Sequence, residues 1–200
     1  MRGLAAPGTS SETHPPKVPG EPGIWVVIFG DLLVFSVIFG TLLVTRAQDF
    51  ESWAAAQRHL NVGVGVVYTL ILLTSSLFVV RAMALMRAGD HQRAPRYVIM
   101  AMACGLAFAV IKVFEYAGKV HAGITMQTDS FYLFYFFVTG LHLAHVLLGM
   151  GLLTLMWFLA RRAGTPAMGD SMRYAEGCAC FWHMVDLLWL VIFALIYLVH

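Results

Sequence analysis

Residues 130–160 read SFYLFYFFVTGLHLAHVLLGMGLLTLMWFLA and contain no Asp, Glu, Lys or Arg. A helix needs about 20 apolar residues to cross the roughly 30 Å of hydrocarbon in a bilayer, because it rises about 1.5 Å per residue. This run is longer than that, so it predicts a membrane-spanning helix that is tilted or extends beyond the bilayer. The period-two alternation typical of a membrane β-strand is absent.

Four further apolar runs lie on either side of this one, at residues 23–45, 62–80, 97–118 and 174–199. The whole chain is 60% hydrophobic and 12% charged, whereas a soluble domain has roughly 45–50% apolar and about 25% charged residues. The sequence therefore predicts an all-α, polytopic membrane helix bundle with five transmembrane helices, formed by residues 23–200. A net charge of +2 without a basic patch excludes nucleic acid as a partner.

The basic residues predict how the chain is oriented in the membrane. Residues 1–22 hold five prolines and no apolar core, which is typical of a flexible cytoplasmic tail. With the N-terminus inside, the inner segments carry nine Lys and Arg residues and the outer segments carry three. Because cytoplasmic segments are enriched in these residues, we expect the N-terminus inside and the C-terminus outside.

Small and aromatic residues in the apolar runs suggest how the helices pack. The start of the fourth run predicts an aromatic belt at the outer interface, made by Phe131, Tyr132, Phe134, Tyr135, Phe136 and Phe137. Glycines predict close approach between helices at Gly63, Gly65, Gly149 and Gly151.

Seven ionisable residues lie inside the apolar runs: Asp31, Lys112, Glu115, His142, His145, His183 and Asp186. Each charged group near the bilayer centre costs about 2.5–3.5 kcal/mol, so such residues usually face the bundle and have a partner. Six of the seven form pairs three residues apart, and residues at that spacing share one face of a helix. We therefore expect a buried polar cluster between the third, fourth and fifth spans.

The residues alone leave the purpose of this cluster open between three interpretations. A hydrogen-bond network that fixes helix packing is one, and a path for protons or ions is another. The third is ligation of a metal or haem by His142, His145 and His183, in an independent membrane redox or metal protein. Against that reading, the sequence lacks paired Glu-x-x-His motifs, and the first two histidines have the wrong spacing for a zinc helix.

Longer motifs in the same runs resemble a known family. Residues 131–151, FYLFYFFVTGLHLAHVLLGMG, and 181–198, FWHMVDLLWLVIFALIYL, resemble the last two helices of subunit III of haem–copper cytochrome c oxidases. The segments GLAFAVIKVFEY at 105–116, LLTSS at 72–76 and EPGIWVVIFGDLLVFSVIFG at 21–40 are similar to earlier parts of that subunit. The resemblance covers residues 21–200.

The resemblance implies a non-catalytic accessory subunit without a redox centre, in the cytoplasmic (inner) membrane of a bacterium. Haem and copper or iron would lie in the partner, the catalytic subunit I, and this chain would support its assembly, stability or proton uptake and bind membrane lipids. Long members of the family have two more helices at the N-terminus and a buried glutamate where Asp31 stands. Short relatives of the NorE type accompany nitric oxide reductases, so the resemblance leaves both enzymes open as partners.

By the same resemblance, six of the intramembrane residues occupy the family's buried polar positions: Asp31, Glu115, His142, His145, His183 and Asp186. A structural or proton-related role is therefore implied for them, rather than metal binding.

Overall fold

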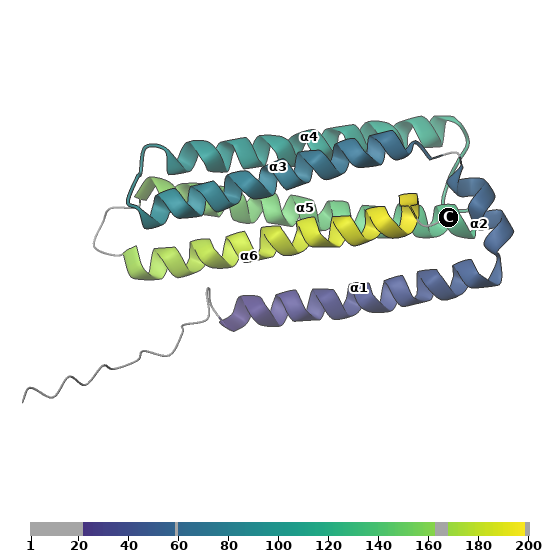
Figure 1. The fold of residues 1–200 in the computed structure, drawn as a ribbon, viewed down its shortest axis with the longest axis horizontal. Coiled ribbons are helices and arrows are strands. Elements are labelled where there is room, and N and C mark those ends of the chain that lie inside the picture. The colour runs from purple at the N-terminus through teal and green to yellow at the C-terminus, as the bar shows by residue number, and fades with distance from the viewer. Residues whose placement is uncertain (1–21, 59, 163–167, 199–200) are drawn as a thin grey trace, which may run out of the picture.

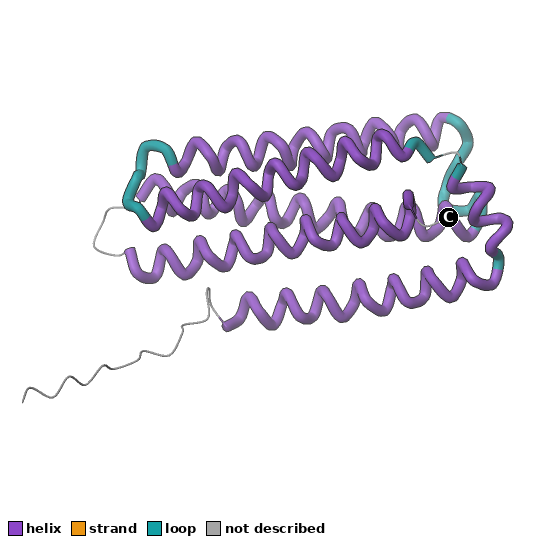
Figure 2. The backbone as a smooth tube through the Cα atoms, in the orientation of Figure 1, coloured by secondary structure: helices purple, strands orange, loops and turns teal. Residues whose placement is uncertain are grey.

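The computed structural model describes residues 22–58, 60–162 and 168–198. These residues form helices joined by short loops, and no strand occurs among them (Figures 1 and 2). The helices are α1 (Pro22–Gln48), α2 (Phe50–Gln57), α3 (Val62–Arg87), α4 (Ala94–His121), α5 (Ser130–Arg162) and α6 (Met168–Phe193), and α6 continues into the π-helical turn η1 (Ala194–Leu198). All but Pro22 of the tail predicted over residues 1–22 lies outside the described residues.

Four long helices, α3 to α6, form an antiparallel bundle in which α3 contacts α4 and α6, and α5 contacts α4 and α6. The remaining long helix, α1, lies alongside the bundle and contacts α5 and α6 (Figure 1). In the described part of the chain, five helices are long and apolar enough to cross a membrane. This finding confirms the prediction of an all-α bundle with five transmembrane helices.

The two ends of the bundle differ. At the basal end, α1, α4 and α6 begin and α3 and α5 end, whereas α2 and η1 lie at the distal end (Figure 1). Arginines gather at the basal end, at Arg87, Arg93, Arg96, Arg161 and Arg162. The basal end is therefore the one that the charge distribution predicts to be cytoplasmic.

The helices extend beyond the apolar runs from which they were predicted. The clearest case is α3, whose apolar run ends near residue 80 but whose helix continues to Arg87. Met83 and Met86 of this extension are buried, while Arg81 and Arg87 are exposed. The helix continues beyond the apolar run because one of its faces still packs on the bundle, while the opposite face carries the exposed arginines.

Between the first two spans, where the hydropathy pattern predicts no element, the structure contains α2. Trp53 of α2 is buried, and its Nε1 donates a hydrogen bond of 3.3 Å to the Ser130 hydroxyl at the start of α5. Gln57 Nε2 donates to the Ile196 carbonyl of η1 at 3.0 Å. This short helix therefore fastens the distal end of the bundle.

The aromatic residues at the start of α5 do not form the expected interfacial belt. Phe131, Tyr132, Tyr135 and Phe136 are buried, and of the six only Phe137 is exposed. The prediction was wrong because it treated the six residues as one band and ignored the direction in which each side chain leaves the helix. Positions 131, 132 and 135 lie on one face of the helix, which packs inward.

Close approach of helices is observed at some of the predicted glycines. A Cβ on Gly149 would lie 2.8 Å from the Trp182 ring, and a Cβ on Gly65 would lie 2.6 Å from Phe193. Gly105 on α4 approaches other atoms of the same Trp182 ring just as closely. For Gly151 the prediction was wrong, since nothing lies within 4 Å of its missing Cβ.

Candidate functional site

Lys112 and Glu115 on α4 form an ion pair in the bundle, with 3.0 Å between Nζ and Oε2. The Lys112 side chain is fully buried, whereas 19% of the Glu115 side chain remains exposed. Their spacing of three residues places them on one face of the helix, as the sequence predicted. A buried charge this far from water needs such a counter-charge, because desolvation costs several kcal/mol per ion.

Three tyrosines from other elements complete the surroundings of this pair. The hydroxyls of Tyr68 on α3 and Tyr135 on α5 donate to Glu115 at 2.8 Å and 2.6 Å. Lys112 Nζ donates to the Tyr135 hydroxyl at 3.0 Å and to the Tyr197 hydroxyl of η1 at 3.4 Å. The network thus ties α3, α4, α5 and η1 together, with hydrogen bonds to both charged groups.

His142 and His145 were expected to lie in one buried polar cluster, but the structure turns them toward different neighbours. His142 is fully buried, with the rings of Phe108 and Trp189 at centroid distances of 5.7 Å and 5.3 Å. Neither of its ring nitrogens has a hydrogen-bond partner among the described residues.

His145 instead faces α1. Its Nδ1 lies 2.8 Å from the Leu141 carbonyl, and its Nε2 lies 3.5 Å from Asp31 Oδ1. The Asp31 carboxyl group is 27% exposed. The contact is a polar link between α1 and α5. This pairing was not among the predictions from the sequence.

His183 and Asp186 on α6 share a neighbour on α3. His183 Nδ1 lies 2.6 Å from the Ser76 hydroxyl. The Asp186 side chain is buried, and neither carboxyl oxygen makes a hydrogen bond of ordinary geometry with any described residue. The Ser76 hydroxyl nevertheless lies close enough to interact with it.

The seven polar residues therefore make four different sets of contacts in the bundle, although Lys112 and His142 both lie beside Trp189. No group of three or more His, Cys, Asp or Glu side chains in the described parts of the chain is arranged to hold a metal ion. In particular His142, His145 and His183 point to different neighbours, namely Trp189, Asp31 and Ser76. Helical spacing predicted the pairs along one helix but not the contacts between helices.

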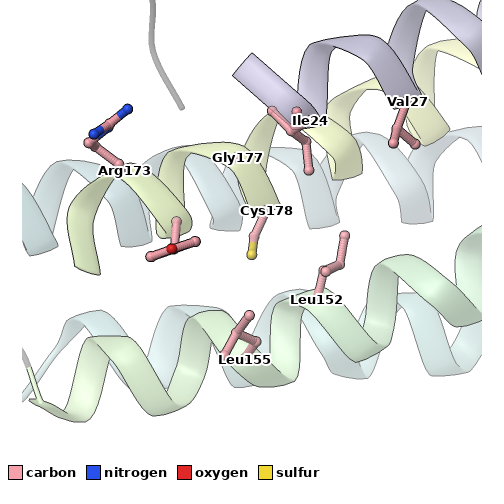
Figure 3. Close-up of a pocket in the computed structure, with 9 residues that line it drawn as sticks. Ile24, Val27, Leu152, Leu155, Arg173, Gly177 and Cys178 are labelled. Carbon is pink, nitrogen blue, oxygen red and sulfur yellow. The ribbon is translucent and has the colours of Figure 1, made fainter. Parts of the chain in front are cut away.

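A recess of about 310 Å³ opens between α1, α5 and α6 near the basal end. Figure 3 shows Leu152 and Leu155 of α5 facing Ile24 of α1 and Cys178 of α6, with Arg173 at its edge. The lining is mainly apolar, so the recess suits hydrocarbon rather than a polar ligand.

Comparisons with known proteins place these features in a family. The family profile for cytochrome c oxidase subunit III matches residues 5–200. Cytochrome c oxidase subunit 3 of Corynebacterium diphtheriae is 29% identical, over 98% of this chain and 95% of that protein. The subunit of the same name from Alkalihalophilus pseudofirmus is 26% identical, over 99% of this chain and 98% of that protein.

A relative named for a different electron donor also matches. Quinol oxidase subunit 3 of Bacillus subtilis is 25% identical, over 88% of this chain and 85% of that protein. The five apolar helices and these bacterial relatives show an integral membrane protein of a bacterium. The match of the family profile along almost the whole chain shows that the protein belongs to the cytochrome c oxidase subunit III family.

Proposed function

We propose that this chain is the non-catalytic subunit III of a respiratory haem–copper oxidase and packs against its catalytic subunit I. The observation that carries the proposal is the family match over residues 5–200, together with relatives of nearly equal length that are named as oxidase subunits. In this proposal the haem and copper belong to the partner, and electrons do not pass through this chain. The relatives reported above carry oxidase names, so the proposal takes an oxidase and not a nitric oxide reductase as the partner.

The buried polar groups support a structural role. Lys112 and Glu115 compensate each other and bond to tyrosines of three other elements. Such a network links helices and favours one packing arrangement over others, which is what a subunit that supports a partner's assembly and durability requires.

The position of Asp31 supports a proton-related role as a further part of the proposal. Its carboxyl group is partly exposed on α1 and lies 3.5 Å from His145, a pair of groups that can both bind and release protons. The recess beside α1 supports the proposal that membrane lipids bind this chain, because its apolar walls fit an acyl chain and Arg173 can attract a lipid phosphate.

The proposal is tested by purifying the tagged chain from its native membrane in mild detergent. The visible spectrum, the metal content and the co-purifying chains are recorded on the same sample. We expect a haem–copper catalytic subunit to co-purify and to account for all the haem and metal. The electron donor of the complex is identified by testing whether the purified complex oxidises cytochrome c or a quinol.

Two outcomes would contradict the proposal. A chain that purifies alone with its own haem absorption band or stoichiometric metal would be an independent redox protein. A partner with nitric oxide reductase activity and no oxidase activity would make the chain an accessory protein of the other enzyme class.

A further inference from the structure

A second recess, of about 300 Å³, lies between the basal halves of α3 and α6. Its lining residues come from these two helices and are Val80, Met83, Ala84, Arg87, Glu176, Ala179, Cys180 and His183. At the basal edge Arg87 and Glu176 form an ion pair of 3.0 Å, and 60% of the Arg87 side chain is exposed. The recess therefore begins at a charged, hydrated surface.

His183 forms the part of the recess farthest from that surface. It lies seven residues after Glu176 along α6, which corresponds to about 10 Å toward the bundle centre. Its Nδ1 is 2.6 Å from the Ser76 hydroxyl, so the ring stands between the recess and a side chain of α3. The walls of the recess are mainly apolar, but the histidine at the inner end and the ion pair at the edge give water polar partners that the first recess lacks along its length.

Asp186 lies beyond His183, one turn farther along α6. It is 5% exposed, its oxygens lack hydrogen bonds of ordinary geometry among the described residues, and Ser76 is the neighbour that interacts with it. A carboxylate buried without a donor or counter-charge costs several kcal/mol, so this site favours the neutral acid.

The charged and titratable groups on the surrounding helices do not compensate Asp186. Lys112 on α4 is held by Glu115, and His145 on α5 is turned toward Asp31 of α1. His142 on α5 packs on Trp189, and α3 contributes the uncharged Ser76. His183 on the same helix is thus the titratable group that connects Asp186 to the recess.

We propose that the recess between α3 and α6 is a water-filled inlet, open at the basal face, to a proton-binding site made by His183, Ser76 and Asp186. This site goes beyond the proposed accessory function and concerns the chain itself, whichever enzyme it accompanies. A hydronium ion in the recess gives its proton to His183 Nε2 and becomes water, and the Nδ1 proton passes to the Ser76 oxygen. The former hydroxyl proton of Ser76 moves to the Asp186 carboxylate, and the reverse order releases it.

The three cysteines of the chain provide a test of the inlet. Cys180 lines the recess, whereas Cys104 lines a shallow, apolar depression between α3 and α4 halfway along the bundle. Two single-cysteine variants of the full chain, one keeping each of these residues, are treated in native membranes with a charged, membrane-impermeant methanethiosulfonate reagent. Right-side-out and inverted vesicles are compared.

We expect the reagent to label Cys180 from the basal face and to leave Cys104 unlabelled from either face. Ala84→Phe, which fills the recess from an exposed position, is expected to abolish labelling of Cys180. The matched control Ala107→Phe, at an exposed position of α4, is expected to leave it unchanged. Absence of labelling in folded protein, or labelling from the distal face alone, would overturn the inlet.

Infrared spectroscopy of the purified full chain tests the proton site. We expect a protonated carboxyl band that disappears in Asp186→Asn and shifts rapidly in D₂O, with the shift slowed in Ser76→Ala and in Ala84→Phe. If Asp186→Asn removes no such band, or if neither variant slows the exchange, the proton-binding site is refuted. Neither measurement depends on the partner. A negative result would therefore refute the proton site and would not bear on the proposed accessory function, which is tested by purification with the partner.

Discussion

Lys112 shows how a single residue can place a charge in the interior of a membrane bundle. Its ammonium group lies 3.0 Å from Glu115 and between 4.8 Å and 6.0 Å from the ring centroids of five aromatic side chains. Ring faces attract cations, and the tyrosine hydroxyls satisfy both members of the pair. Both charged groups therefore have hydrogen-bond partners. Removing one of them leaves the other charge buried in apolar surroundings without its counter-charge.

We predict that Lys112→Met and Glu115→Gln each destabilise the folded chain by about 3–5 kcal/mol, because each leaves one buried charge without its partner. The double variant Lys112→Met/Glu115→Leu is expected to lose less stability than either single variant. Thermal unfolding of the purified chain in mild detergent measures the difference. Equal midpoints for all three variants and the unaltered chain would show that the pair contributes nothing to stability.

Trp182 gives a second prediction at this scale, because two glycines make room for its ring. A methyl group at Gly149 would lie 2.8 Å from the indole, and overpacking of this kind costs about 1–3 kcal/mol. We therefore expect Gly149→Ala to lower the unfolding midpoint. Gly151→Ala is the matched control on the same helix, since nothing lies within 4 Å of that position. Equal effects of the two changes would show that the helices separate freely there.

At the scale of elements, hydropathy predicted the existence of the five long helices, since only a helix satisfies its own backbone in hydrocarbon. It could not predict α2, which is short and mixed in polarity and is held to the bundle by contacts such as the one between Trp53 and Ser130. The bond from Gln57 to the Ile196 carbonyl joins residues far apart in sequence. Contacts of that kind depend on tertiary structure rather than on local pattern.

The same distinction separates the predicted and the unforeseen parts of the site. Lys112 and Glu115 lie on one helix, so the helical repeat was enough to predict their proximity. The contact between Asp31 and His145 depends on the side of the bundle that α1 occupies, which no spacing within one span specifies. Tyr68 and Tyr197 were missed for this reason, although a buried cation could have indicated nearby ring faces and hydroxyls.

The docking of α1 is the prediction that belongs to this scale. This helix lies outside the ring formed by α3 to α6, and Asp31 makes a polar contact with α5. We expect Asp31→Leu to loosen α1 from the bundle while the other helices stay folded. Hydrogen–deuterium exchange should then rise in residues 46–58, which form the end of α1 and the short helix α2.

Ser36→Ala is the control for that experiment. The Ser36 hydroxyl donates to the Leu32 carbonyl of its own helix and is exposed, so its removal should not alter exchange. Exchange that is unchanged in Asp31→Leu would show that apolar contacts alone hold α1 in place.

At the scale of the whole molecule, the arrangement of the helices determines at which end of the bundle the basic residues lie. The loop 88–93 and the end of α5 lie together at the basal end, although 70 residues separate Arg162 from Gln92. Arginines from distant parts of the chain thus gather at one end of the bundle. Membrane insertion retains Lys-rich and Arg-rich segments on the cytoplasmic side, so the basal end is predicted to face the cytoplasm.

Reporter fusions test this orientation. Alkaline phosphatase needs the disulfides that form in the periplasm, so it is active only when it is exported. We expect a fusion after Gly123, in the distal loop, to be active and a fusion after Gly89, in the basal loop, to be inactive. A fusion after His200 should behave like the distal one. The opposite pattern would reverse the chain in the membrane, and it would also move the proposed proton inlet to the outer face.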